Sequence, residues 1–303
     1  MSNLETLKKD LPFFLKTPCV ESNILAPLTS FQIGGKADFF CRPVNKEDLV
    51  SLQQFAVSGK IPFFVIGGGS NILISDNGFK GFVIHLQDGF NKITIKDSLI
   101  YAGAGVKLGH LLGTCAEHGL SGFEFLTGIP GTVGGILSTN AGAFGYDTAS
   151  KVKTVEILKQ NGQLVTMAAE DLSFGYRRGC ISNYEIITEA VFELEFEQSE
   201  KIKERMHLFM KKKCASQPIG EKSAGCVFKN PEGTHAGKLI DDVGLKGFEK
   251  GNAKISPIHA NFIVNCGGAK AKDVIYLMDT AMDRVFNHFS IKLEPELKII
   301  GDR

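Results

Sequence analysis

The chain lacks an excess of charge of either sign. Its 34 Lys and Arg residues against 33 Asp and Glu residues leave a formal net charge of +1 over 303 residues. A chain without a strong overall field has no general attraction for nucleic acid. The densest basic run, residues 211–213, closes a charged helical stretch and is typical of a solvated face or a helix C-terminus. We therefore expect no nucleic-acid partner.

The chain also lacks long apolar runs. No stretch approaches the ~18 apolar residues that a membrane-spanning helix needs. The N-terminal segment MSNLETLKKD has no apolar core of the kind that signal peptides carry. We expect a cytoplasmic protein that does not associate with a membrane, and nothing in the sequence indicates an obligate protein partner.

Cysteine is present without a recognisable pattern. The cysteines stand at positions 19, 41, 115, 180, 214, 226 and 266, with no C-x-x-C pair and no flanking histidine pattern. A disulfide framework or a zinc site would need such spacing. The histidines show no metal spacing either, and only His259 is expected near a functional site. We expect reduced thiols, most of them buried, and no metal site.

Glycine, in contrast, is concentrated in two patches. Residues 121–145 hold seven glycines and one charged side chain, Glu124, and a second patch, residues 67–71 (GGGSN), follows the apolar run 61–66. Glycine lets main-chain N–H groups approach a ligand with no Cβ in between. Two such patches indicate one large phosphate-bearing ligand held by main chain. The alternative is that both patches are only turns and tight packing points.

Neither patch carries a familiar nucleotide motif. The sequence GIPGTVGG lacks the Gly-Lys-Ser/Thr ending of a P-loop. The triple glycine at 67–69 lacks the third glycine of a Rossmann dinucleotide turn. The sequence alone therefore predicts a nucleotide site of another type.

The periodicity of the chain predicts an α+β protein with three parts. These are a first lobe over residues 1–88, a second lobe over 89–198 and a separate domain over 199–303, with a ligand site between the last domain and the glycine-rich body. The helices are expected at 45–58, 107–118, 199–215, 235–243 and 270–289. The strands are expected at 61–66, 81–86, 92–96, 99–102, 152–158, 186–197, 253–256, 262–264 and 297–300.

Five parts of the chain together resemble the UDP-N-acetylenolpyruvoylglucosamine reductase (MurB) family. They are TSFQIGGKADFF (29–40), VIGGGSNILIS (65–75), the segment 119–145, FGYR (174–177) with GCVFKNP (225–231), and HANFIVN (259–265) with LEPELKIIG (293–301). The resemblance implies a two-lobed FAD-binding body of the vanillyl-alcohol-oxidase-like type with a C-terminal α+β substrate domain. The short span after Arg177 is similar to the compact form of the family.

The resemblance also implies a reaction. Members of the family reduce the enolpyruvyl ether of UDP-N-acetylglucosamine to UDP-N-acetylmuramate, with NADPH as co-substrate and a bound FAD, in peptidoglycan precursor synthesis. The partners so implied are a UDP-sugar and NADPH. Oxidases of this fold often tether FAD through a histidine in the first glycine-rich loop, and residues 67–71 offer none. We therefore expect FAD to be bound non-covalently.

Three residues take the catalytic roles that the resemblance implies: Arg177, Cys226 and Glu296. An arginine presents a planar fork of donors that fits a substrate carboxylate. Cys226 stands where the family commonly has a serine as proton donor, and a thiol with a pKa of ~8.5 releases its proton more readily than an alcohol. Each has an ordinary alternative: a surface ion-pair arginine, a packing cysteine and a solvated strand carboxylate, for which Glu294 is the confusable neighbour.

The remaining site residues are binding candidates. For FAD they are Gly67, Gly68, Gly69, Ser70, Asn71, Gly105, Gly128, Ile129, Pro130, Gly134, Gly135, Asn140, Ala141 and Gly142. For the substrate they are Tyr176, Arg178, Lys229 and Asn230. Two positions depart from the family pattern, because Gly179 stands where a serine is common and Ser216 where a lysine is common. Both departures concern the contacts to the diphosphate.

Two other functions compete with the reductase. One is another FAD-dependent oxidoreductase of the same fold, such as an oxidase of an alcohol or sugar. The other is a catalytically inactive module that binds flavin or a UDP-sugar, which the departures at Cys226, Gly179 and Ser216 motivate. Both alternatives remain open on the sequence alone.

Overall fold

The computed structural model describes residues 19–302 except 88 and 183, and it divides into two compact units. Unit 1 contains residues 19–22, Asp38–Gly67 and Gly81–Phe209. Unit 2 contains Asn23–Ala37, Gly68–Lys80 and the chain from Met210 onward. Two short N-terminal segments thus belong with the C-terminal part of the chain. The three-part division by sequence boundaries stays a prediction.

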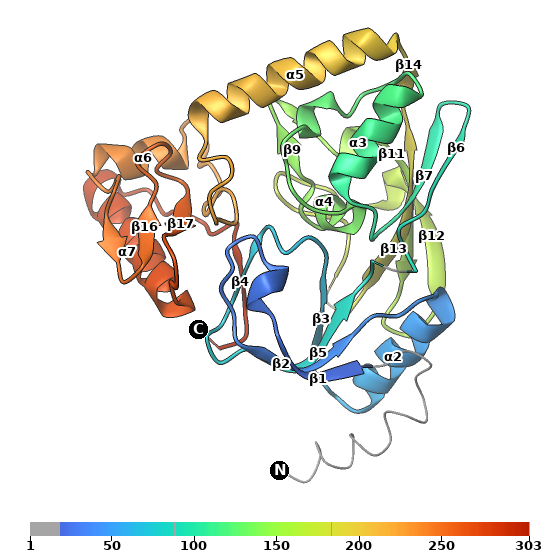
Figure 1. Ribbon diagram of the computed structural model, residues 1–303, viewed down its shortest axis with the longest axis horizontal. Helices are drawn as coiled ribbons and strands as arrows, with labels where there is room; N and C mark the ends of the chain where they lie inside the picture. The colour runs from blue at the N-terminus through green and yellow to red at the C-terminus, as the bar shows by residue number, and fades with distance from the viewer. Residues whose placement is uncertain (1–18, 88, 183, 303) are drawn as a thin grey trace. The chain divides into compact units, whose positions relative to one another are not determined.

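The first sheet of unit 1 has the strand order β1-β2-β5-β3, and helix α2 connects β2 to β3 along the chain (Figure 1). Asn45 begins α2 because its side chain accepts a hydrogen bond from Asp48 N at 2.8 Å. Leu49, Leu52 and Ala56 recur on one face of the helix and are buried. The elements are β1 (Cys19–Ile24), β2 (Lys36–Cys41), α2 (Lys46–Ser58), β3 (Phe63–Ile66) and β5 (Phe79–His85).

The second sheet of unit 1 has five antiparallel strands in the order β12-β11-β13-β7-β6. Its strands are β6 (Ile93–Lys96), β7 (Leu99–Gly103), β11 (Val152–Leu158), β12 (Leu164–Ala168) and β13 (Ile186–Glu193). The glycine-rich chain nearby forms α3 (Leu108–Glu117), α4 (Val133–Thr139) and the short strands β8 (Leu120–Ser121), β9 (Gly142–Ala143) and β10 (Tyr146–Asp147). The strand β14 (Glu195–Phe196) pairs with β8. One apolar core joins both sheets of the unit.

Unit 2 is built around the antiparallel sheet β15-β16-β17, with helices α6 and α7 (Figure 1). Its elements are β4 (Ile72–Ile74), α6 (Ala236–Asp242), β15 (Glu249–Lys250), β16 (Ala253–Ile255), β17 (Ile263–Asn265), α7 (Ala271–Phe289) and β18 (Lys298–Ile300). The segment 68–80 belongs here because β4 pairs in parallel with β18. Asp76 adds to this, since its carboxylate accepts hydrogen bonds from the first N–H groups of α7, at 2.8 Å from Ala271 N.

The helix α5 (Ser199–Ser216) begins in unit 1 and ends in unit 2. In unit 1, Arg205 on this helix donates to the buried carboxylate of Glu124 at 2.8 Å. The basic run at residues 211–213 lies near the end of α5, with Lys213 in the last turn, as expected for a helix C-terminus. Lys213 itself is 4% exposed, whereas its two neighbours are exposed. The reason is that helical geometry turns the third residue of the run toward the protein interior.

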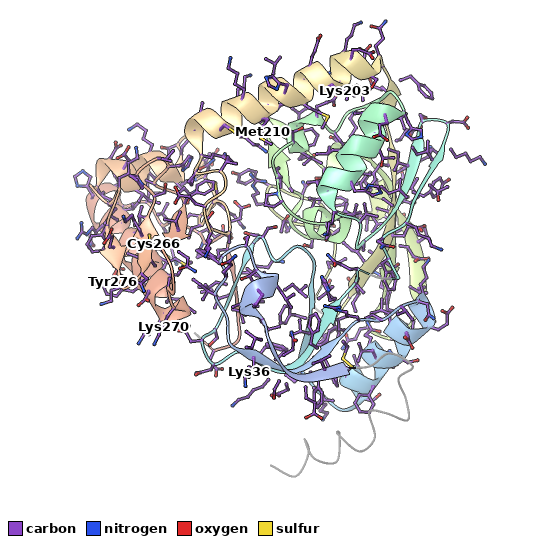
Figure 2. The ribbon with its side chains drawn as sticks, viewed as in Figure 1. Lys36, Lys203, Met210, Cys266, Lys270 and Tyr276 are labelled. Atoms are coloured by element: carbon purple, nitrogen blue, oxygen red, sulfur yellow. A yellow bond between two sulfur atoms is a disulfide. The ribbon has the colours of Figure 1, made fainter. Side chains whose placement is uncertain are left out.

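The expectation that every thiol is reduced is wrong for one pair. Cys19 and Cys41 form a disulfide with a Cα–Cα distance of 4.3 Å, drawn as a yellow bond in Figure 2. Their spacing gave no signal because the pairing depends on β1 and β2 lying side by side. The expectation that most cysteines are buried is also wrong, since only Cys41 and Cys115 are buried and the other five are partly or fully exposed.

Two other absences concern the residues that the structure describes. Within them, no helix is both long and apolar enough to cross a membrane. The same part of the chain holds no group of three or more His, Cys, Asp or Glu side chains arranged to bind a metal ion.

Candidate active site

The two glycine-rich patches meet inside unit 1. Gly67 follows β3, and a Cβ at this position would collide with the hydroxyl oxygen of Thr132. Thr132 is the N-cap of α4, and its side chain accepts from Gly135 N at 3.3 Å. Only a residue without a side chain allows this approach. The first residue of the first patch, Gly67, therefore lies against Thr132 near the centre of the second patch.

Several main-chain donors of the second patch are already used by the protein. Four N–H groups donate to internal acceptors: Ile129 N to Leu126 O at 2.9 Å, Val133 N to Val106 O at 2.9 Å, Gly134 N to Ala104 O at 2.8 Å, and Gly135 N to Thr132 Oγ1. Gly128, Ile129, Gly134 and Gly135 are nevertheless partly exposed. We therefore expect Gly134 and Gly135 to serve a ligand by close approach of their Cα atoms, without offering free N–H groups.

Asn140 connects this patch to the segment that carries Arg177. Its side chain is 4% exposed, and Asn140 itself adopts the left-handed conformation at the end of α4, with φ of 46°. The amide nitrogen donates to Gly175 O at 3.1 Å and to Asp147 Oδ2 at 3.3 Å, and the amide oxygen accepts from Ala149 N at 2.9 Å. These bonds give Asn140 a structural role, whether or not it also contacts a cofactor.

Arg177 lies in a tight turn of unit 1. Gly175 and Arg178 exchange main-chain hydrogen bonds, at 3.0 Å from Gly175 N and 3.1 Å from Arg178 N. Arg177, the third residue of this turn, has φ of 52°, a left-handed conformation that is uncommon for residues other than glycine. Such a conformation costs on the order of 1 kcal/mol or more in a residue with a Cβ. Of the neighbours expected to contact substrate, Tyr176 and Arg178 are both exposed.

Gly179, one of the two departures from the family pattern, has a structural cause. A Cβ at this position would collide with the main-chain atoms of Leu137 and Ser138 at the end of α4. A serine in the same backbone position would therefore need the chain to move. The turn of Arg177 is thus packed directly against the helix of the second glycine-rich patch.

In unit 2, Cys226 and Glu296 lie on adjacent extended segments. Cys226 forms a bridge with Phe262 on one side of its segment. On the other side, Val227 O accepts from Glu296 N at 2.8 Å, and Phe228 bridges to Pro295. The structure therefore brings together two of the three residues expected to be catalytic.

Glu294 and Glu296 differ in exposure, since Glu294 is exposed and Glu296 is half-buried. Lys229 Nζ lies 2.5 Å from Glu294 Oε1, and Lys229 N donates to Glu294 O at 2.9 Å. Glu294 thus has an ion-pair partner on the Cys226 segment. Asn230 has a structural contact, because its amide oxygen accepts a hydrogen bond from Ala236 N, at the start of α6, at 3.0 Å.

The downstream end of the first glycine patch is attached to the Glu296 segment. Asn71 Nδ2 donates to Glu296 O at 3.3 Å, and Lys298 N donates to Asn71 O at 3.2 Å. Gly69, just before, has φ of 61° and packs against Leu28 O so closely that no Cβ fits. The loop that is expected to bind the cofactor and the segment of Glu296 are therefore tied within unit 2.

Asn261 is a residue that the sequence reasoning missed. Its side chain is 2% exposed and pairs with the main chain of Phe228 in both directions. His259 lies beside it and accepts from Asn261 N at 3.2 Å. Burial lowers the pKa of His259, so its ring is neutral near pH 7 and its other nitrogen carries the proton. The polar residues of HANFIVN, which stand among apolar residues just before and in β17, were the available signal.

The fold and these segments define a two-part flavoprotein. Residues 37–168 match the family described as FAD binding domain. Residues 217–300 match the family described as UDP-N-acetylenolpyruvoylglucosamine reductase, C-terminal domain. The chain is therefore an FAD-binding α+β protein with the expected C-terminal domain, as the sequence predicted.

The particular family follows from whole-chain similarity. The UDP-N-acetylenolpyruvoylglucosamine reductase of Carboxydothermus hydrogenoformans is 40% identical over 298 residues, which cover 98% of each chain. That of Clostridioides difficile is 40% identical over 274 residues and 90% of each chain. The crystal structure of the Thermus caldophilus enzyme superposes with a TM-score of 0.82 at 36% identity, over 95% of this chain and all of that one. The chain belongs to the UDP-N-acetylenolpyruvoylglucosamine reductase family.

Proposed function

We propose that this chain reduces UDP-N-acetylglucosamine enolpyruvate to UDP-N-acetylmuramate with NADPH, through non-covalently bound FAD, in peptidoglycan precursor synthesis. Membership of the family and the matched FAD-binding segment support this reaction. The observation that supports a role for particular residues is that Cys226 and Glu296 lie on adjacent, hydrogen-bonded segments of unit 2.

The residues of the glycine-rich patches fit FAD. They offer main chain without side chains at Gly67, partly exposed glycines at 128, 134 and 135, and no charged side chain other than the buried Glu124 in residues 121–145. When bound, FAD supplies the hydride that NADPH provides. Residues 67–71 contain no histidine that could tether a flavin. The protein's own task is to place the substrate and to deliver a proton.

Arg177 is proposed to bind the substrate carboxylate. A guanidinium stays protonated and can hold both carboxylate oxygens while negative charge grows beside it in the reaction. The turn of residues 175–178 fixes the main chain from which this side chain extends. Arg178, Tyr176 and Lys229 remain proposals for contacts to the rest of the UDP-sugar.

Cys226 is proposed to donate the proton in place of a serine. Its segment keeps the surrounding GCVFKNP sequence and is held by hydrogen bonds on both edges. A thiol is a competent general acid near neutral pH, because its ordinary pKa lies within ~2 units of that pH. Glu296 is proposed to assist by hydrogen bonding to the group that receives the proton.

We also propose a cytoplasmic location, because the nucleotide co-substrates of this reaction are made there. The Cys19–Cys41 disulfide argues in the other direction, since the cytosol keeps thiols reduced. Alkylation of the protein immediately on cell lysis, followed by mass spectrometry, decides the state of this pair. Recovery of both cysteines as free thiols supports the cytoplasmic location, and recovery of the disulfide opposes it.

The test of the reductase against its rivals is steady-state NADPH oxidation by the purified yellow protein. The proposal predicts that oxidation rises with added enolpyruvyl-UDP-N-acetylglucosamine and that the flavin is released on denaturation. A yellow protein whose NADPH oxidation does not respond to this substrate indicates an inactive binding module. Flavin that stays attached after unfolding favours a tethered oxidase.

A further inference from the structure

The amide of Asn261 replaces a neighbouring strand for one residue of the Cys226 segment. Phe228 N donates to Asn261 Oδ1 at 2.9 Å, and Asn261 Nδ2 donates to Phe228 O at 2.8 Å. The main chain of Asn261 adds a third bond, from Val227 N to Asn261 O at 2.8 Å. Asn261 and Phe228 are both 2% exposed. Water is therefore a poor substitute for these bonds.

The fixed residues lie directly beside Cys226. Cys226 precedes Val227 in the chain and forms its bridge with Phe262, the residue after Asn261. The peptide group between Val227 and Phe228 is also bonded on its other side, because Glu296 N donates to Val227 O at 2.8 Å. A displacement of residues 226–228 would thus move Cys226 and alter its register with Glu296 at once.

We propose that Asn261 is the positioning residue that fixes Cys226 for proton delivery. The inference rests on the proposed role of Cys226. Asn261 acts through residues 226–228 and is not proposed to contact the substrate or the cofactor. Its amide is suited to this because the oxygen accepts from the N–H of Phe228 while the nitrogen donates to the C=O of the same residue.

Asn265 offers a matched control in the same motif. It is 7% exposed, lies at the end of β17, and donates to Phe31 O at 2.8 Å. Its amide oxygen accepts from Gly267 N at 2.9 Å and Ala269 N at 3.0 Å. Asn265 therefore resembles Asn261 in burial and in bonding, but none of these bonds reaches the Cys226 segment.

Truncation to alanine leaves buried main-chain groups without partners in both cases. Such a loss costs on the order of 1–3 kcal/mol per group. We expect Asn261→Ala and Asn265→Ala to lower the melting temperature to a similar extent. The two variants should differ in which segment opens more often, because local unfolding increases where the hydrogen bonds have been removed.

The first measurement separates the two half-reactions under anaerobic conditions. With Asn261→Ala, NADPH should reduce the flavin at the native rate, whereas reoxidation by the enolpyruvyl substrate should slow by about 10- to 100-fold, as expected for a misplaced reacting group. Substrate affinity should stay within about three-fold of native, so that the effect falls on the rate constant. Asn265→Ala should leave both half-reactions close to native.

The second measurement does not depend on activity. The alkylation rate of Cys226 by iodoacetamide is followed by peptide mass spectrometry, with the exposed Cys214 as internal reference. Asn261→Ala should accelerate the alkylation of Cys226 by about ten-fold, because the freed segment opens more often. Asn265→Ala should leave it unchanged, even though Cys266, labelled in Figure 2, follows the mutated residue directly.

The outcomes separate this inference from the role of Cys226 itself. The inference is overturned if the two variants change reoxidation and Cys226 alkylation equally, or if Asn261→Ala changes neither. A Cys226→Ala variant that reoxidises at the native rate overturns the proposed proton donor instead, whatever Asn261→Ala does. Selective loss in Asn261→Ala together with slow reoxidation in Cys226→Ala supports both.

Discussion

The turn of Arg177 in unit 1 and the segment of Cys226 in unit 2 are both anchored by a buried asparagine, but to different degrees. Asn140 bonds the turn at one point, Gly175 O, and the turn contains a residue with φ of 52°. Asn261 bonds Phe228 in both directions, and a second segment pairs with the other edge. The more completely bonded of the two segments is the one that carries Cys226, the proposed proton donor.

This difference agrees with the chemistry proposed for each side chain. A long arginine reaches a carboxylate by charge over some distance and can adjust its side-chain torsions. A general acid must lie within hydrogen-bond reach of the atom that it protonates. We therefore expect changes in the Cys226 segment to affect the rate constant, and changes in the Arg177 turn to affect both binding and stability.

The largest effect is expected at Cys226. Cys226→Ala should slow reoxidation of the reduced flavin by substrate by about 10²- to 10⁴-fold, the usual contribution of a general acid. Flavin reduction by NADPH should be unaffected. Cys226→Ser is the matched variant and should keep measurable activity, because serine is the common residue of the family at this position. Equal loss in both half-reactions would indicate a role in folding.

Replacement of Arg177 should have the next largest effect. Arg177→Lys keeps the charge but loses the planar fork, so the ratio kcat/KM should fall by roughly 10²- to 10³-fold. Arg284, exposed on α7 and not among the site candidates, provides the control, and Arg284→Lys should leave kcat/KM within about two-fold of native. Steady-state kinetics over a range of substrate concentrations checks both. If the two variants lose activity equally, the assignment to Arg177 is wrong.

A change at Gly179 should act mainly on stability. Gly179→Ala forces a Cβ against the main chain of Leu137 and Ser138, and should lower the free energy of unfolding by ~1–3 kcal/mol. Gly113, within α3, has open space at its Cβ position, so Gly113→Ala should be stabilising by ~0.5–1 kcal/mol. Urea unfolding measures both. An unchanged Gly179→Ala would show that the turn moves freely on α4.

The smallest effect is expected from the acid–base balance of Glu124. Burial raises the pKa of this carboxyl, but hydrogen bonds from main chain, Arg205 and Ser121 together outweigh burial and hold the pKa below its ordinary value of 4.5. A depressed pKa stabilises the fold above the ordinary value, and this contribution is lost as pH falls through the folded-state pKa. The melting temperature should therefore drop below about pH 4.5.

The charge-neutral variant tests this origin. Glu124→Gln should lower the melting temperature at pH 7 and flatten its dependence between pH 3 and pH 5. Glu193 gives a control, because its ion pair with Lys153 at 3.2 Å is exposed and contributes little. Glu193→Gln should leave the profile almost unchanged. A Glu124→Gln profile as steep as the native one would assign the acid sensitivity to other groups.

Much of the fold could be predicted because its helices and strands have strong local patterns. The helices expected at 107–118 and 270–289 are observed as α3 and α7, within one residue at each end. Among the strands that were missed, β1 and β12 lie at sheet edges and β4 is short, whereas β2 lies inside its sheet and its burial does not alternate regularly along the strand. The joining of residues 23–37 and 68–80 to unit 2 could not be predicted, since it depends on tertiary contacts such as Asp76 with α7.

The candidate site shows the same limit. Motifs led to Arg177, Cys226 and Glu296, but they could not reveal what holds these residues in place. Asn140 was expected only as a cofactor contact, and Asn261 was not singled out. Their roles depend on main-chain partners more than 30 positions away, at Gly175 and Phe228. Likewise, the disulfide of Cys19 depends on strand pairing that has no signature in cysteine spacing.

The central claim is tested most directly by the two anaerobic half-reactions of the native protein. The account predicts that NADPH bleaches the bound flavin and that enolpyruvyl-UDP-N-acetylglucosamine then restores its colour, with UDP-N-acetylmuramate as the product. Flavin that NADPH reduces but this substrate does not reoxidise would contradict the account.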